Sequence, residues 1–323
     1  DSVPSHAWNR WRYHYPQGAF PYDDLIAENA RRDKHQPEYE VLDTGAFDDD
    51  RYWVVEVDYA KDGPDDIIMT VRATNVGPDA ATLHVLPTAW FRNTWTWDVD
   101  APKPTLELRD DGAIAIEHPT VGPMELIGAP APDGTAPTPL FCDNETNDRR
   151  LYGSDTGARF PKDSINDHVV HGEPTVNPDH TGTKVSMLYR LDVAAGATTQ
   201  IHLRLRPVTG ATPPTSKADF DEILAERERE ADEFYASLAP AGCSDDEAMV
   251  MRQAFAGMLW GKQLFAYDVR RWLDGDPTQP APPENRRSAR NARWTHFDAF
   301  DIMSMPDPWE YPWFAAWDLG FHC

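Results

Sequence analysis

The first two-thirds of the chain consists of short apolar segments separated by turn sequences. The segments at 51–59 and 67–75 are rich in Val, Ile, Tyr and Trp, and turn residues lie around them, as in Asn-Val-Gly-Pro at 75–78. β-Branched and aromatic residues favour extended backbone, whereas Gly, Pro, Asn and Asp favour reversal. The pattern predicts a sandwich of antiparallel sheets. Residues 119–179 are loop-rich, and no strand is assigned to them. The expected strands cover residues 51–59, 67–75, 82–91, 105–109, 113–117, 184–193 and 199–207.

The pattern changes from strands to helices near residue 210. Residues 210–214 read Gly-Ala-Thr-Pro-Pro, which is typical of a linker. Ser216 can cap a helix over 218–238. Ser244 and Glu247 form a capping box, which predicts a second helix through about residue 272. We therefore expect a β domain, a linker with a helix and a helical region, at 1–210, 211–243 and 244–323.

The end of the sequence is dense in aromatic residues and acids. Pro312 suits the first position of a helix, and Trp313, Trp317 and Phe321 then fall on one helical face. Asp318 lies on the neighbouring face. Indole rings stack on the flat C–H faces of a sugar, and carboxylates accept strong hydrogen bonds from its hydroxyls. The spacing is equally typical of a buried aromatic helix whose Asp binds a backbone amide, so both interpretations stay open.

The chain carries a formal charge of −24, from 54 acidic and 30 basic residues. This charge argues against a nucleic-acid partner, because a phosphate backbone needs a basic surface. No apolar run approaches the ~20 residues that cross a bilayer, so no membrane partner is expected. Cys142, Cys243 and Cys323 have wide, irregular spacing, which is typical of free thiols in a reducing compartment. We therefore expect a cytoplasmic protein.

The sequence predicts neither a metal site nor a cofactor. His168 and His171 lack the Glu and the helical spacing of a zinc-protease motif, and we expect a hydrogen-bonding pair in a loop. The three acids at 48–50 lack the spacing of a calcium loop, and we expect them in a solvated turn.

Two further aromatic groups have competing interpretations. Tyr-Asp-Asp at 22–24 lies among other aromatic residues, and a structural contact between domains is the expected role. Trp90, Trp95 and Trp97 could form a lectin-like platform. Three aromatic residues on a sandwich strand more often pack the sheets together, and packing is therefore the expectation.

Four stretches of the sequence are specific enough to point to a family. They are residues 15–53, HVLPTAWFRNTWTW at 84–97, DNETNDRRLYG at 143–153 and SMPDPWEYPWFAAWDLGFH at 304–322. The last stretch resembles the start of the catalytic barrel in bacterial glucosidase-like proteins of glycoside hydrolase family 63, and the first three resemble the amino-terminal half of such proteins. That family includes processing α-glucosidase I and the mannosylglycerate hydrolases. The resemblance covers most of the chain.

The resemblance implies an antiparallel β-supersandwich, a linker helix and the first helices of an (α/α)6 barrel, with the chain a fragment of a longer protein. It implies an exo-acting, inverting α-glycosidase that hydrolyses an α-glucoside or a related small glycoside. The catalytic acid and base are expected beyond residue 323, so no catalytic residue is assigned within the chain. The substrate-binding residues that it implies are Asp318, Trp317, Trp313, Tyr311 and His322.

Two other functions stay open alongside the hydrolase. Many β-sandwiches bind carbohydrate without chemistry of their own, so the chain could be a binding or supporting module. Phosphorylases of similar architecture use inorganic phosphate in place of water. In all three cases the expected partner is a carbohydrate.

Overall fold

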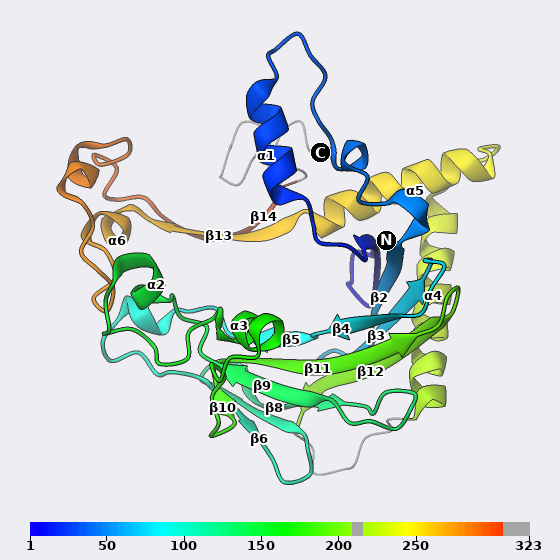
Figure 1. Ribbon diagram of the computed structural model, residues 1–323, viewed down its shortest axis with the longest axis horizontal. Helices are drawn as coiled ribbons and strands as arrows, with labels where there is room; N and C mark the ends of the chain where they lie inside the picture. The colour runs from blue at the N-terminus through cyan, green and yellow to red at the C-terminus, as the bar shows by residue number, and fades with distance from the viewer. Residues whose placement is uncertain (209–215, 306–323) are drawn as a thin grey trace.

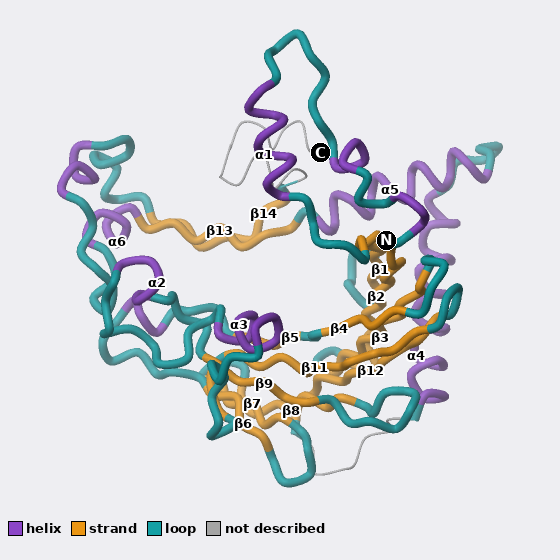
Figure 2. The backbone as a smooth tube through the Cα atoms, viewed as in Figure 1, coloured by secondary structure: helices purple, strands orange, loops and turns teal. Residues whose placement is uncertain are grey.

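The computed structural model describes residues 1–208 and 216–305. Two antiparallel β-sheets form a sandwich, and helices and a long hairpin follow it in the chain (Figure 1). Figure 2 shows the strands of the two sheets gathered in one body, with the long hairpin apart from them. The expected order of β-structure followed by helices is confirmed. The (α/α)6 barrel stays a prediction, and the expected boundary near residue 210 falls outside the described residues.

The larger sheet contains eight strands within the described residues, each antiparallel to its neighbours. Their spatial order is β1 (Trp8–Pro16), β2 (Tyr52–Gly63), β3 (Asp66–Asn75), β12 (Thr198–Pro207), β8 (Gly122–Gly128), β7 (Ile114–His118), β6 (Thr105–Leu108) and β10 (Thr181–Gly182). In the smaller sheet β11 (Lys184–Val193) pairs with all the other strands. Those strands are β4 (Ala81–Val85), β5 (Thr88–Trp90) and β9 (Thr138–Cys142).

The main hydrophobic core lies between the two sheets. Trp53, Val71 and Ile201 of the larger sheet pack with Phe141 and Val185 of the smaller sheet, and all five are buried. Successive side chains of a strand point to opposite faces, so every second residue of these strands reaches this core. The intervening residues lie on the outer face of the larger sheet, where charged side chains become possible.

The helix α4 (Lys217–Leu238) covers the outer face of the larger sheet (Figure 1). Its first turn confirms Ser216 as the N-cap, because the Ser216 hydroxyl accepts a hydrogen bond from the backbone N–H of Asp219. Phe220 is fully buried in a second hydrophobic cluster that includes Trp8 of β1. Helix and sheet therefore share a small core of their own, separate from the main one.

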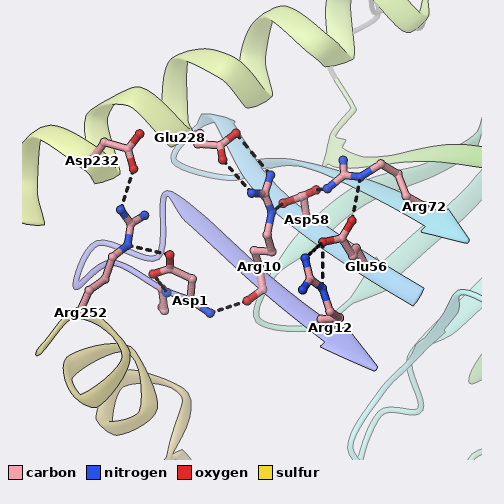
Figure 3. Close-up of polar contacts among 10 residues, drawn as sticks. Asp1, Arg10, Arg12, Glu56, Asp58, Arg72, Glu228, Asp232 and Arg252 are labelled. Atoms are coloured by element: carbon pink, nitrogen blue, oxygen red, sulfur yellow. Dashed lines mark hydrogen bonds and ion pairs between the residues drawn. The ribbon is translucent and has the colours of Figure 1, made fainter. Parts of the chain in front are cut away.

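A network of ion pairs surrounds this second core (Figure 3). The carboxylate of Asp58 on β2 is 1% exposed, and the Nε atom of Arg10 on β1 donates to it over 2.6 Å. Arg72 on β3 pairs with its other oxygen. Arg10 also pairs with Glu228 of α4 over 2.7 Å. One buried charge thus links three strands to the helix.

The next helix, α5 (Asp245–Trp260), is joined to α4 by charge as well. Arg252 of α5 donates to Asp232 of α4 and to Asp1, each over 2.7 Å (Figure 3). The expected capping box is confirmed, because the Ser244 hydroxyl accepts from the backbone N–H of Glu247 while the Glu247 carboxylate accepts from that of Ser244.

Six of the predicted strands are confirmed, as β2, β3, β6, β7, β11 and β12. The predicted strand at 82–91 is divided into β4 and β5, because Pro87 lies between them and has no backbone N–H for a ladder. The loop assigned to 119–179 is partly wrong. It contains β8, β9, α2 (Asp148–Tyr152) and α3 (Ser164–His171).

The prediction of one helix from 244 to about 272 is wrong in its second half. The helix ends at Trp260, and Gly261 is its C-cap. β13 (Lys262–Asp268) follows and pairs with β14 (Asp298–Ser304), and the short helix α6 (Val269–Asp274) lies between them. Residues 262–268 include Leu, Phe and Tyr, which pack well on a pleated surface. The spacing of these residues also suits a helix, but pairing with β14 favours the strand. The connection back to β14 contains the 3₁₀ helix η4 (Glu284–Ser288).

The remaining elements lie between β1 and β2 and after β5. The helix α1 (Tyr22–Arg31) projects from the sandwich and buries none of its residues (Figure 1). Its Tyr22 is 67% exposed, so the expected contact between domains stays a prediction. The three acids at 48–50 form an exposed turn of 3₁₀ helix, as expected. The other 3₁₀ helices are η1 (Val41–Thr44) and η3 (Trp95–Trp97). None of the described helices combines the length and the apolar character needed to cross a bilayer.

Removal of the buried charge at Asp58 should destabilise the protein strongly. The Asp58→Asn variant leaves Arg10 and Arg72 facing a neutral amide, and we expect the free energy of unfolding to fall by about 3–5 kcal/mol. Urea unfolding measures this change. The matched control is Asp192→Asn, because Asp192 forms an exposed ion pair with Arg190 and should change stability by less than about 1 kcal/mol. Equal losses in the two variants would contradict the role given to Asp58.

The buried ring of His202 should make stability fall at acid pH. Its Nδ1 atom lies 2.8 Å from Thr70 Oγ1, its ring stacks on Phe220, and burial lowers its pKa from the usual 6.5. Below about pH 6.5 the unfolded chain takes up a proton that the folded protein resists, so this contribution declines as pH falls toward the lowered pKa. We expect the difference in the free energy of unfolding between the wild type and His202→Gln to shrink between about pH 7 and about pH 5. Urea titrations at the two pH values measure it. A constant difference would exclude this linkage.

Candidate functional site

A cleft with aromatic walls lies between the sandwich and the α6 region. It has a volume of about 450 Å³, and we call it the aromatic cleft. Figure 1 shows α2 of the sandwich beside α6, the two elements that face each other here. The rings that line it are Trp97, Tyr152, Tyr267, Trp272 and Phe300.

The short helix α6 presents two of the lining residues. Asp268 caps it, since its Oδ1 atom accepts hydrogen bonds from the backbone N–H groups of Arg270, over 2.9 Å, and Arg271, over 3.2 Å. Val269 and Leu273 are buried one turn apart on one face. Arg271 and Trp272 lie on the remaining surface of the helix and line the cleft.

Two arginines lie over the indole rings of the cleft and make cation–π contacts with them. The Cζ atom of Arg271 is 4.5 Å from the ring centroid of Trp97, and that of Arg286 is 5.0 Å from the ring of Trp272. Arg286 also donates to the backbone oxygen of Trp272 over 2.9 Å. The contact between Arg271 and Trp97 joins α6 to η3, and therefore connects the two sides of the cleft.

Three carboxylates line the same cleft, from Asp268, Asp276 and Asp298. The Oδ1 atom of Asp268 already accepts the two backbone hydrogen bonds that cap α6. Within residues 1–208 and 216–305, the side chains of Asp276 and Asp298 make no hydrogen bond or ion pair. Free carboxylates beside exposed rings can accept hydrogen bonds from the hydroxyls of a ligand whose apolar face rests on those rings. Phe300 and Tyr152 are 63% and 58% exposed and offer such surface.

The substrate-binding residues expected from the sequence lie outside the described residues. These are Asp318, Trp317, Trp313, Tyr311 and His322. Their roles stay predictions.

Of Trp90, Trp95 and Trp97, which were expected to pack the sheets together, only Trp95 is buried, and it is not part of the core between the sheets. Trp95 is buried, and its Nε1 atom donates to Glu145 Oε1 over 2.9 Å. Trp90 is 59% exposed, and Trp97 lines the aromatic cleft. The difference has a local cause: Trp95 and Trp97 belong to a turn of 3₁₀ helix and not to a strand, so they point in different directions.

No group of three or more metal-ligand residues occurs in the part of the chain that the structure describes. The expected loop position of His168 and His171 is wrong, because both lie in α3, which ends at Gly172 in the left-handed conformation. His168 Nδ1 does form a local hydrogen bond, 2.8 Å from the backbone oxygen of Glu173. Burial raises the pKa of Cys142 to about 12, so this thiol is not a nucleophile at neutral pH.

The cleft itself was not expected from the sequence. Trp97 and Tyr152 belong to the sandwich, whereas Tyr267, Trp272 and Phe300 come from the hairpin region. The nearest signal is the resemblance over 84–97 and 143–153, which contains the two sandwich residues. Nothing in those stretches indicates which distant segment completes the site.

Comparison with known proteins finds no matching family model. The chain is 32% identical, over 364 aligned positions, to the uncharacterized protein YMR196W of Saccharomyces cerevisiae. The alignment covers 100% of this chain and 34% of the yeast protein. The chain therefore spans about one third of the length of this relative.

Proposed function

We propose that the aromatic cleft binds a glycoside, as part of an exo-acting, inverting α-glycosidase. The observation that carries this proposal is the combination of exposed rings and unpaired carboxylates around one cavity of about 450 Å³. That volume suits a small ligand, since small-molecule sites typically measure about 300–1,000 Å³. The hydrolytic activity rests on the resemblance to glycoside hydrolase family 63.

The two kinds of lining group serve different parts of a sugar. Phe300 and Tyr152 offer apolar surface for C–H faces, and Asp276 and Asp298 offer charged acceptors for hydroxyls. A ligand with apolar faces and many hydroxyls satisfies both. A purely apolar ligand would leave the two carboxylates desolvated without a partner, which is costly.

Hydrolysis requires two further carboxyl groups. An inverting enzyme holds an acid and a base roughly 6.5–9.5 Å apart, so that water fits on the far face of the sugar. We assign neither role within this chain and place both beyond residue 323. Asp318, with Trp317 and Trp313, would hold the sugar ring that is cleaved.

Carbohydrate binding without hydrolysis is the second candidate. It is favoured by one observation: among the described residues, the cleft offers both rings and carboxylates that can hold a sugar, and none of them is assigned a catalytic role. Binding and hydrolysis assays on the same protein separate the two candidates. Added inorganic phosphate tests the phosphorylase, because only that enzyme would release a sugar phosphate.

Loss of a cleft ring should weaken glycoside binding. For Phe300→Ala we expect the Kd of small α-glucosides to rise about tenfold, which corresponds to about 1.4 kcal/mol. Isothermal titration calorimetry measures this value. Trp90→Ala is the matched control, since Trp90 is exposed to a similar degree but lies outside the cleft. If the Kd rises by a similar factor in both variants, or rises in neither, the cleft is not the sugar site.

The Asp318→Asn variant tests the role that the resemblance implies, in the full-length enzyme. The change keeps the shape and replaces charge-assisted hydrogen bonds with neutral ones, at a cost of about 1.5–3 kcal/mol. We expect kcat/KM to fall by about one to two powers of ten. Aryl glycosides with good and poor leaving groups should lose activity alike. Rescue by a good leaving group would instead identify Asp318 as the general acid.

A further inference from the structure

We infer that the sandwich holds a second ligand site, between its two sheets, for an uncharged apolar small molecule. The site is a cavity of about 480 Å³, which we call the inter-sheet cavity. Among the described residues, no side chain lines both this cavity and the aromatic cleft. The two sites are therefore separate, and the second does not depend on the proposed function.

Both sheets contribute walls to the inter-sheet cavity. Val57 of β2, Met69 of β3 and Leu203 of β12 line it from the larger sheet. Val85 of β4 and Ala89 of β5 line it from the smaller sheet. All five also belong to the main hydrophobic core or pack against it. The cavity is therefore a gap in the layer where the two sheets pack together.

The lengths of the strands explain why the sheets leave this gap. The strands β2, β3 and β12 contain 12, 10 and 10 residues, whereas β4 and β5 contain 5 and 3. Pro87 interrupts the smaller sheet between β4 and β5, and it lines the cavity. The short strands cover only part of the long ones, so part of the apolar face of the larger sheet meets the cavity.

The walls of the cavity are complementary to an uncharged ligand. None of the described residues that line it is Asp, Glu, Lys, Arg or His, although charged residues make up 26% of the chain. The hydroxyl of Thr88 is already engaged, since it donates to the backbone oxygen of Leu86 over 2.8 Å and lies 2.7 Å from Ser186 Oγ. A charged group in this space would lose its hydration and meet no opposite charge, which is strongly unfavourable.

The spacing of the sheets limits the size of the occupant. Sheets that pack face to face lie about 10 Å apart, and a helix with its side chains measures about 10–12 Å across. A helix would therefore have to force the two sheets apart. The volume of about 480 Å³ falls within the range of about 300–1,000 Å³ that is typical of small-molecule sites. Apolar cavities of this kind stay dry and take up apolar molecules.

Two tryptophans lie where the cavity meets solvent. Trp11 of β1 and Trp90 of β5 both line it, and they are 38% and 59% exposed. Trp11 lies opposite the wall residue Val57 in the register of β1 and β2. A ligand with aromatic rings can contact this indole surface together with the aliphatic walls.

Two fluorescent dyes with the same ring system test the charge preference in the full-length protein. N-Phenyl-1-naphthylamine is uncharged, and 1-anilinonaphthalene-8-sulfonate carries one added sulfonate. We expect the uncharged dye to bind at least about tenfold tighter in fluorescence titrations. The preference should persist at about 500 mM NaCl, because salt screens the repulsion from the acidic protein but does not remove the cost of desolvating the sulfonate. Equal affinity for the two dyes would overturn the inference.

A variant that fills the cavity assigns the dye to this site. Ala89→Phe places a ring in the space, and it should raise the Kd of the uncharged dye at least about tenfold. Ala115→Phe is the matched control, because Ala115 of β7 is also half-buried on a strand but lines neither site. If Ala89→Phe fails to fold, Trp90→Ala removes an exposed wall and should raise the Kd about fivefold. A Kd that stays unchanged in the folded variant would overturn the inference.

The variant Phe300→Ala separates this site from the aromatic cleft. It should leave the Kd of the uncharged dye within about twofold, because changes at distant sites act independently. Loss of dye binding in Phe300→Ala would place the dye in the aromatic cleft and overturn the inference. Failure of the dye to bind to the full-length protein would also overturn it, since another part of that protein would then fill the cavity. Both results leave glycoside binding, which is measured separately, unaffected.

Discussion

The buried carboxylate of Asp58 is the interaction on which the arrangement of the helices depends. It is 1% exposed, and Arg10 and Arg72 neutralise it from the two neighbouring strands. An isolated carboxylate in this position would be strongly unfavourable, so the three side chains are held together. Arg10 extends the pairing to Glu228, and this places α4 across the outer face of the larger sheet (Figure 3).

The aromatic cleft follows from the position of α4. Arg252 joins α5 to α4, and from the end of α5 the strand β13 runs to α6, beside α2 of the sandwich (Figure 1). The stack of Arg271 on Trp97 then fixes the two sides of the cleft against each other. A charge pair on one side of the molecule and a cation–π contact on the other therefore define the space in which a ligand can bind.

Features of this sequence that depend on neighbouring residues predict the structure, whereas contacts between distant segments are not visible in it. The helix starts at Ser216 and Ser244 each depend on a few adjacent residues, and the structure confirms both N-caps. The segment after Trp260 contains Leu, Phe and Tyr, which suit either a helix or a strand, and only pairing with β14 decides between them. The sugar-binding residues near the end of the chain stay a prediction, whereas the cleft was not foreseen at all.

The sequence by itself determined the alternation that makes a sandwich, the positions of its turns and the capped starts of α4 and α5, because each depends on residues that are neighbours along the chain. Only the tertiary structure decided that Trp97 meets Arg271 and that Asp58 lies between two arginines. These contacts join segments far apart in sequence. Burial and charge neutralisation, which arise only once the sheets and helices pack, select them.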